Sequence, residues 1–99
     1  MDIHYLNYII AIAEEKNMTR AAQRLYVSQS SLSHYLAKLE QELGTALFFR
    51  GKNELIPTPA GEMYLDAARR VVEIQQTLYK NIRSLDKRGH LRISTTSQW

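Results

Sequence analysis

The chain contains no cysteine, which excludes disulfide bonds and thiolate metal sites. No run of apolar residues approaches the roughly 20 that a membrane-spanning helix requires. The N-terminal stretch also lacks the basic flank and the small-residue cleavage site of a signal peptide. From these absences we expect a cytoplasmic protein without a membrane segment.

Glycine and proline are scarce, with four and two residues in a chain of 99. So few glycines leave no glycine-rich phosphate loop. The three histidines, His4, His34 and His90, fall on separate predicted elements and show no metal-ligand spacing. We therefore expect no enzymatic activity, no bound metal and no other cofactor.

Length and charge narrow the remaining classes of protein. A chain of 99 residues forms one small domain and little more. The net charge is +3, but residues 1–58 carry six basic and six acidic side chains, so the whole excess lies in residues 59–99. An argument for nucleic-acid binding must therefore depend on where individual basic side chains point.

Three helices are predicted in the first half of the chain, the first over residues 3–16. A short helix over residues 20–25 follows, with Thr19 as its N-cap. After a turn of three residues, a third helix begins behind Ser28 and runs over residues 29–43. The buried face of the first helix is expected to consist of Leu6, Ile9, Ile10 and Ala13.

A β-hairpin and a long helix are predicted in the second half. Residues 47–49 and 54–57 form two short apolar strands around a Gly-Lys-Asn turn. Thr58 and Pro59 then provide the N-cap and the first residue of a helix that runs to about residue 88. The expected fold is mainly α, a winged helix-turn-helix of three helices and a two-stranded wing, followed by a long dimerisation helix.

The third predicted helix begins with serines and a glutamine, although serine is a mediocre helix former. DNA-binding helix-turn-helix proteins place the first turns of the second helix of the motif in the major groove. Small polar side chains can approach base edges there, and glutamine can form two hydrogen bonds with adenine. Basic side chains on the short helix and the hairpin would meet phosphates or the minor groove. The expected DNA contacts are Thr19, Arg20, Arg24, Ser28, Gln29, Ser30, Ser33, His34, Lys38, Arg50 and Lys52.

These features also have simpler explanations. The serines taken alone fit a capping cluster on a solvated helix, and Arg50 and Lys52 fit exposed turn residues about equally well. The short preceding helix, the tight turn and the hairpin favour DNA binding over capping alone. A protein–protein adaptor is the alternative function, because residues 1–58 are electrically neutral.

A seven-residue spacing of apolar side chains in the long helix predicts a heptad seam. The usual alternative is a stripe buried in the domain's own core. This helix is too long for a headpiece of 58 residues to cover, so the spacing favours a homodimer. The expected interface residues are Tyr64, Ala67, Val71, Ile74, Leu78, Asn81 and Leu85.

Over residues 1–94 the sequence resembles the N-terminal part of LysR-type transcriptional regulators. The resemblance rests on "YLNYIIAIAEEKNMTRAAQRLYVSQSSLSHYLAKLEQELGTALFFR", then "TPAG", then "GHLRIS". It implies a winged helix-turn-helix, a linker helix that dimerises, and a C-terminal effector-binding domain of two α/β lobes, of which "LRIS" would be the first strand.

The residues and the resemblance together give one expectation. Residues 1–58 form the DNA-binding domain, residues 59–88 the linker helix, and residues 89–99 the hinge and first strand of the effector-binding domain. The protein is expected to regulate transcription by binding specific double-stranded DNA as a dimer on an interrupted inverted repeat. A tetramer is left open for the full-length protein.

Overall fold

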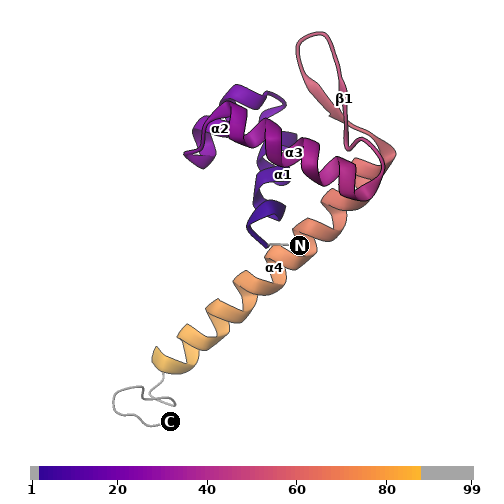
Figure 1. Cartoon of the computed structure of the whole chain (residues 1–99). Helices are drawn as coiled ribbons and strands as arrows, with labels where there is room; N and C mark the ends of the chain where they lie inside the picture. Colours follow the sequence, from indigo (N-terminus) through magenta and orange to yellow (C-terminus); the bar gives the residue numbers. More distant parts are fainter. Residues whose placement is uncertain (1–2, 88–99) are drawn as a thin grey trace.

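A computed structural model describes residues 3–87 and confirms the expected fold class. The headpiece is a winged helix-turn-helix, and a long helix leaves it (Figure 1). Gly89 and the strand predicted over residues 91–94 lie outside the described residues. The elements in chain order are α1 (Ile3–Glu15), α2 (Met18–Leu25), α3 (Gln29–Leu43), β1 (Phe48–Arg50), β2 (Leu55–Pro57) and α4 (Pro59–Lys87).

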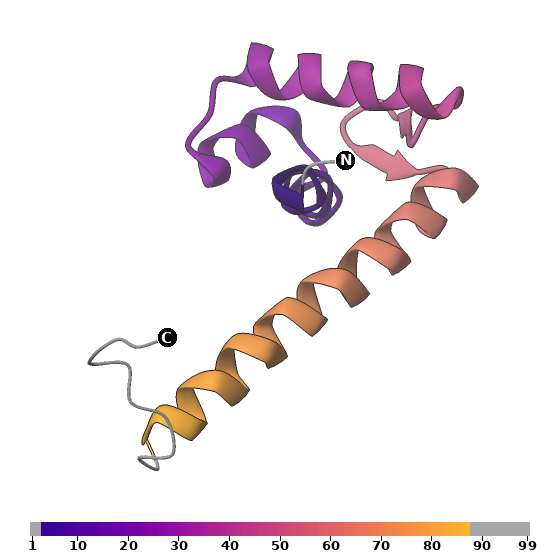
Figure 2. The same cartoon turned by 60° about the horizontal axis from the view of Figure 1, so that its bottom comes forward.

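Helix α1 lies at the centre of the structure. It contacts α2 and α3, and it also contacts α4 and β2. Figure 2 shows α1 end-on, between α3 and α4. Because it is covered from two sides, Ala11 and Ile12 are buried together with Ile9. The single buried face predicted from the sequence was too narrow, and its other three members, Leu6, Ile10 and Ala13, are only half-buried.

Helix α2 begins earlier than predicted, and its N-cap is Asn17 instead of Thr19. The Oδ1 atom of Asn17 accepts a hydrogen bond from the N–H of Arg20 at 2.9 Å. Asparagine is at least as good an N-cap as threonine, and the earlier start places Met18 in the core. The helix ends at Tyr26, whose φ of 59° lies in the left-handed region.

Helix α3 has the predicted bounds and the predicted N-cap. The Oγ atom of Ser28 accepts a hydrogen bond from the N–H of Ser31 at 3.0 Å. Gly44 ends the helix with a φ of 75°, a conformation that glycine adopts without a steric penalty. Three leucines on one side of the helix are buried: Leu32, Leu36 and Leu39.

The hairpin is a two-stranded antiparallel wing that is tied to α3. Phe48 lies opposite Pro57, where proline is tolerated because both strands are edges. The carboxylate of Glu40 on α3 accepts a hydrogen bond from the N–H of Leu47 at 2.7 Å. This bond fixes the first residues of the hairpin against the end of α3.

The first turn of α4 is locked to the same hairpin, at what we call the Thr58–Gly61 joint. The Thr58 hydroxyl donates to the carbonyl of Ala46 at 2.7 Å and accepts from the N–H of Gly61 at 3.0 Å. The N–H of Thr58 donates to the carbonyl of Leu47 at 3.0 Å. A Cβ atom on Gly61 would lie 2.0 Å from that carbonyl oxygen. The predicted N-cap is therefore confirmed, and it also sets the direction of α4.

Only the first part of α4 packs on the headpiece. Leu65 and Ala68 are buried, and Tyr64 packs partly buried against the core. Beyond them α4 projects away from the other elements (Figure 1).

We expect Gly61→Ala to destabilise the headpiece by about 3 kcal/mol or more, because the new methyl group would overlap a backbone carbonyl that cannot retreat. Gly44→Ala is the matched control. The added Cβ atom would have no other atom within 4 Å. The substitution should cost only about 1 kcal/mol of stability, because alanine disfavours the left-handed backbone conformation. Urea unfolding of both variants measures the difference, and equal losses would contradict the close contact at the joint.

Candidate nucleic-acid interface

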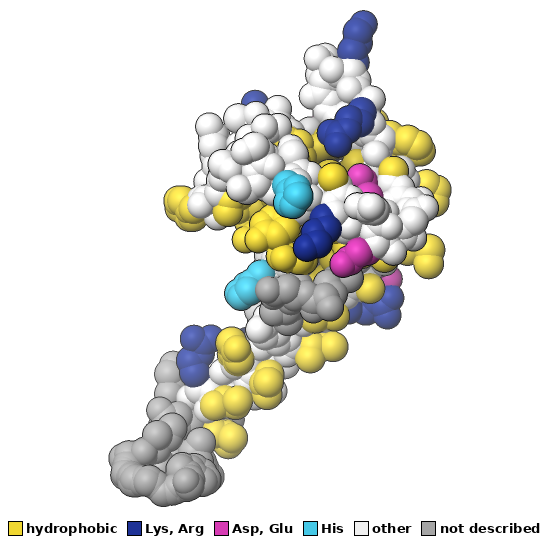
Figure 3. All heavy atoms as spheres, viewed as in Figure 1, with side chains coloured by type: hydrophobic (Ala, Val, Ile, Leu, Met, Phe, Trp, Pro, Cys, Tyr) yellow, Lys and Arg dark blue, Asp and Glu magenta, His cyan; other side chains and the backbone are white. Residues whose placement is uncertain are grey.

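Helix α3 presents a small polar face on the side away from its buried leucines. Gln29 and Ser30 are exposed in the first turn, and His34 and Lys38 follow them along the helix. Ser33 is half-buried at the edge of this face. Figure 3 shows basic and histidine side chains on the surface formed by the headpiece and the wing. Of the predicted α3 residues, Ser30, His34 and Lys38 line one surface hollow together. Gln29 is nine residues from Lys38 and lies on the opposite side of the helix from it.

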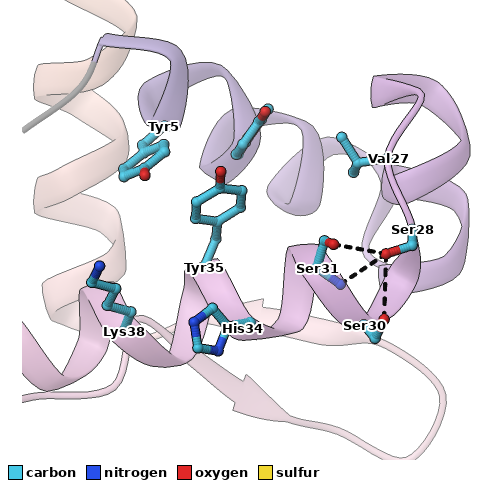
Figure 4. A pocket seen from close by; sticks show the side chains of 9 residues that line it. Tyr5, Val27, Ser28, Ser30, Ser31, His34, Tyr35 and Lys38 are labelled. Atoms are coloured by element: carbon cyan, nitrogen blue, oxygen red, sulfur yellow. Dashed lines mark hydrogen bonds between the residues drawn. The ribbon is translucent and has the colours of Figure 1, made fainter.

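The serines at the start of α3 form a capping cluster, as the simpler explanation held. In addition to the backbone bond, the Ser28 hydroxyl donates to the Ser31 hydroxyl at 2.8 Å and lies 3.3 Å from that of Ser30 (Figure 4). The cap satisfies backbone donors and holds the first turn in place. The capping role of Ser28 does not bury the neighbouring side chain, because Gln29 in the same turn is exposed to solvent.

A cluster of tyrosines beside α3 was missed by the sequence reasoning. The ring centroid of Tyr35 lies 4.5 Å from that of Tyr5 and 5.1 Å from that of Tyr8, in tilted arrangements (Figure 4). Such aromatic pairs contribute stability beyond the area they bury. The signal available in the sequence was the spacing of Tyr5 and Tyr8, one turn apart on the first helix. These rings fix the first turns of α1 to the flank of α3.

The two arginines of α2 lie in different surroundings. Arg24 forms ion pairs with Glu14 at 2.8 Å and Glu15 at 3.3 Å. The hydrogen bond to Glu14 raises the pKa of Arg24 above its ordinary value. Arg20 is exposed in the first turn of α2, next to exposed Thr19. From the sequence, both arginines were predicted to contact DNA. The two carboxylate partners of Arg24 were not predicted.

The wing carries two exposed bases, Arg50 at the end of β1 and Lys52 in the turn. The turn between α1 and α2 holds the wing in place, since the N–H of Leu55 donates to the carbonyl of Lys16 at 3.0 Å. The wing is thus tied by hydrogen bonds to the α1–α2 turn through Leu55 and to α3 through Leu47 and Glu40.

An apolar stripe remains exposed along α4, and Figure 3 shows hydrophobic side chains gathered there. Successive members are three or four residues apart, as on one face of a helix. Ile82 is an exposed apolar side chain next to the predicted Asn81 and belongs to this stripe as well. Burial against the headpiece raises the pKa of Tyr64, and Ala67 is exposed. The stripe, with exposed fractions between 40% and 68%, consists of Val71, Ile74, Leu78, Ile82 and Leu85.

Neither a metal-binding cluster nor a membrane-spanning helix is present among the described residues. Residues 3–87 contain no group of three histidine or acidic side chains that could hold a metal ion. No helix in this range combines the length and the apolar character needed to cross a membrane.

Comparison with known proteins gives the family. Residues 3–62 match the lysR family of bacterial regulatory helix-turn-helix proteins. The chain belongs to this family. The LysR-family match covers the whole headpiece and the first turn of α4, including the Thr58–Gly61 joint.

Two curated relatives cover nearly the whole chain. The uncharacterised HTH-type transcriptional regulator YkuM of Bacillus subtilis is 39% identical over 90 residues, which are 91% of this chain and 31% of the relative. The HTH-type transcriptional regulator BudR of Klebsiella aerogenes is 35% identical over 99 residues, 98% of this chain and 69% of the relative. The chain thus spans about a third of the first relative's length and about two thirds of the second's.

Two solved structures show the same fold. The DNA-binding domain of BenM, in complex with the catB site 1 DNA, has a TM-score of 0.80 and 29% identity. It covers 87% of this chain and 96% of its own. The DNA-binding domain of CbnR, also in complex with DNA, has a TM-score of 0.75 and 36% identity over 87% of this chain and 99% of its own.

Proposed function

We propose that this chain binds specific double-stranded DNA sequences and that it is the DNA-binding and dimerisation part of a transcription regulator. The observation that carries the proposal is the small polar face at the capped start of α3, joined rigidly to a basic wing. The DNA complexes of BenM and CbnR support it, because their domains share this fold. In this assignment residues 1–58 bind DNA, residues 59–88 are the linker helix, and residues 89–99 lead into an effector-binding domain.

Helix α3 is proposed to read bases in the major groove. Gln29 leads the helix, and its side-chain amide can donate to and accept from the edge of an adenine. Ser33 follows one turn later on the side of Gln29, and His34 lies on the side of Ser30, so a hydroxyl and an imidazole are proposed to meet neighbouring base pairs. Lys38 lies one turn farther along and suits a phosphate at the groove edge. The short side chains of Ser30 and Ser33 allow the helix axis to approach the base pairs closely.

Phosphate contacts are proposed around this helix. Thr19 and Arg20 at the start of α2 face one strand, and Arg50 and Lys52 of the wing face the backbone or the minor groove. Arg24 is assigned a supporting role, because its guanidinium is already paired with Glu14 and Glu15. Ser28 likewise contributes through its cap, which positions Gln29.

The apolar stripe of α4 is proposed to pair with the same stripe of a second chain. A homodimer would remove these side chains from water and present two copies of α3 to one duplex. The proposed interface comprises the predicted residues, with Ile82 added beside Asn81. A tetramer is left to the full-length protein, and the proposed place of action is the cytoplasm. No enzymatic role is proposed, since the relatives are named as transcriptional regulators.

We expect Gln29→Ala to lose roughly 1–3 kcal/mol of preference for the cognate base pair, while non-specific binding changes little. Gln41→Ala removes the same side chain from the exposed far end of α3 and should leave both unchanged. Fluorescence titration with the selected site and with single-base variants measures the preference. A loss shared equally by all sequences would make Gln29 a scaffold residue.

We expect the double variant Val71→Glu, Leu78→Glu to be monomeric, because two carboxylates per chain would have to be buried in the interface. Its headpiece should stay folded, since the buried core of residues 9–68 does not include either side chain. Sedimentation and DNA titration should show monomers that bind a full site far more weakly.

The control for this experiment is Gln76→Glu, Thr77→Glu, which adds the same charge to exposed positions of α4 outside the stripe. It should remain dimeric. A Val71/Leu78 variant that stays dimeric would place the interface elsewhere, and a monomer with full affinity would refute binding to paired half-sites.

A further inference from the structure

Lys16 adopts a backbone conformation that is unfavourable for lysine. Its φ of 58° lies in the left-handed region, which glycine enters without steric cost and other L-residues seldom occupy. Lys16 stands in the turn between α1 and α2, and its side chain is exposed. Neither the base-reading role of α3 nor the dimer accounts for a lysine at this position.

The conformation is imposed by two backbone hydrogen bonds. The N–H of Lys16 donates to the carbonyl of Ile12 at 2.8 Å and closes the last turn of α1. The carbonyl of Lys16 accepts from the N–H of Leu55 at 3.0 Å and holds the wing. Any residue at this position must adopt the same φ, so glycine would satisfy the backbone at lower cost. What lysine adds is its charged side chain.

That side chain lines a basic hollow between the wing and the start of α2. The hollow has a volume of about 410 Å³. Three basic side chains line it, against one acidic side chain, Glu54. We call it the Lys16 hollow, and its basic members are Lys16, Arg50 and Lys52.

The start of α2 adds to the positive potential of this hollow. Asn17 and Met18, the N-cap and first residue of α2, both line it. The N-cap amide accepts from the N–H of Arg20, and the preceding N–H groups of the first turn have no partner within the helix. The helix dipole places partial positive charge at this end, which favours an anion.

We propose that the Lys16 hollow binds a phosphate of the DNA backbone, with the Lys16 ammonium as a direct contact. The inference rests on the proposed DNA-binding function and extends the phosphate contacts from the wing to the α1–α2 turn. The contact is independent of base sequence, so it strengthens binding to every duplex and adds to its salt dependence. Lys16 thereby connects the wing and the start of α2 into one continuous binding surface for a DNA strand.

The test uses the whole 99-residue chain and measures its affinity for a selected site and for an unrelated duplex over a range of salt concentrations. Lys16→Gln removes the charge and keeps an unbranched polar side chain that is one atom shorter. It should weaken binding several-fold on both duplexes and reduce the salt slope by about one unit. Lys16→Arg should keep the slope of the wild type. Lys80→Gln removes one exposed charge from the far part of α4 and should change neither quantity.

A second variant separates a DNA contact from a structural role. Lys16→Gly relieves the left-handed strain, so its melting temperature should rise while its affinity for DNA falls. A salt slope in Lys16→Gln and Lys16→Gly equal to that of the wild type would overturn the inference and leave the proposed function intact. A wild-type chain that binds neither duplex would instead contradict the proposed function itself.

Discussion

The arrangement of the molecule depends on two hydrogen bonds that the hydroxyl of Thr58 forms. This hydroxyl caps α4 and at the same time bonds the carbonyl of Ala46, so the long helix and the hairpin share one fixed point. Gly61 allows this approach, because no side chain fits between its backbone and the carbonyl of Leu47. The carboxylate of Glu40, near the end of α3, accepts a hydrogen bond from the N–H of Leu47. The proposed base-reading helix, the wing and the proposed dimer helix are therefore positioned relative to one another by a few hydrogen bonds around residues 46–61.

Each functional surface uses this rigidity in a different way. Helix α3 needs it because hydrogen bonds to base edges demand a fixed orientation. Its own cap at Ser28 and the contact of Tyr35 with Tyr5 and Tyr8 serve the same end. The wing is held by the hydrogen bond between Leu55 and Lys16, which fixes the position of the basic side chains that are proposed to meet a DNA strand. In the proposed dimer, the separation of the two headpieces depends on the angle at which α4 leaves each headpiece.

Local chemistry explains which features could be predicted from the sequence. Ser28 and Thr58 were predicted correctly as N-caps, since caps depend on a few neighbouring residues. The start of α2 was misplaced because burial of Met18, a tertiary effect, decides between Asn17 and Thr19.

The ion pairs of Arg24 and the tyrosine cluster join segments far apart in the chain, so no local sequence pattern predicts them. Ile82 was not predicted because the seven-residue spacing assigned the neighbouring position to Asn81. The left-handed backbone of Lys16 is imposed by the distant Leu55, and its place beside Arg50 and Lys52 emerges only in the folded headpiece.

The central claim is that rigid joints fix two headpieces of a dimer for one spacing of half-sites. The most direct measurement is the affinity for duplexes in which the two half-sites are moved apart by single base pairs through one helical turn. The account predicts a sharp optimum. An insertion of about five base pairs, which turns one half-site to the opposite side of the duplex, should reduce the affinity to that of a single half-site. An affinity that stays the same at every spacing would show that the headpieces move independently and would contradict the account.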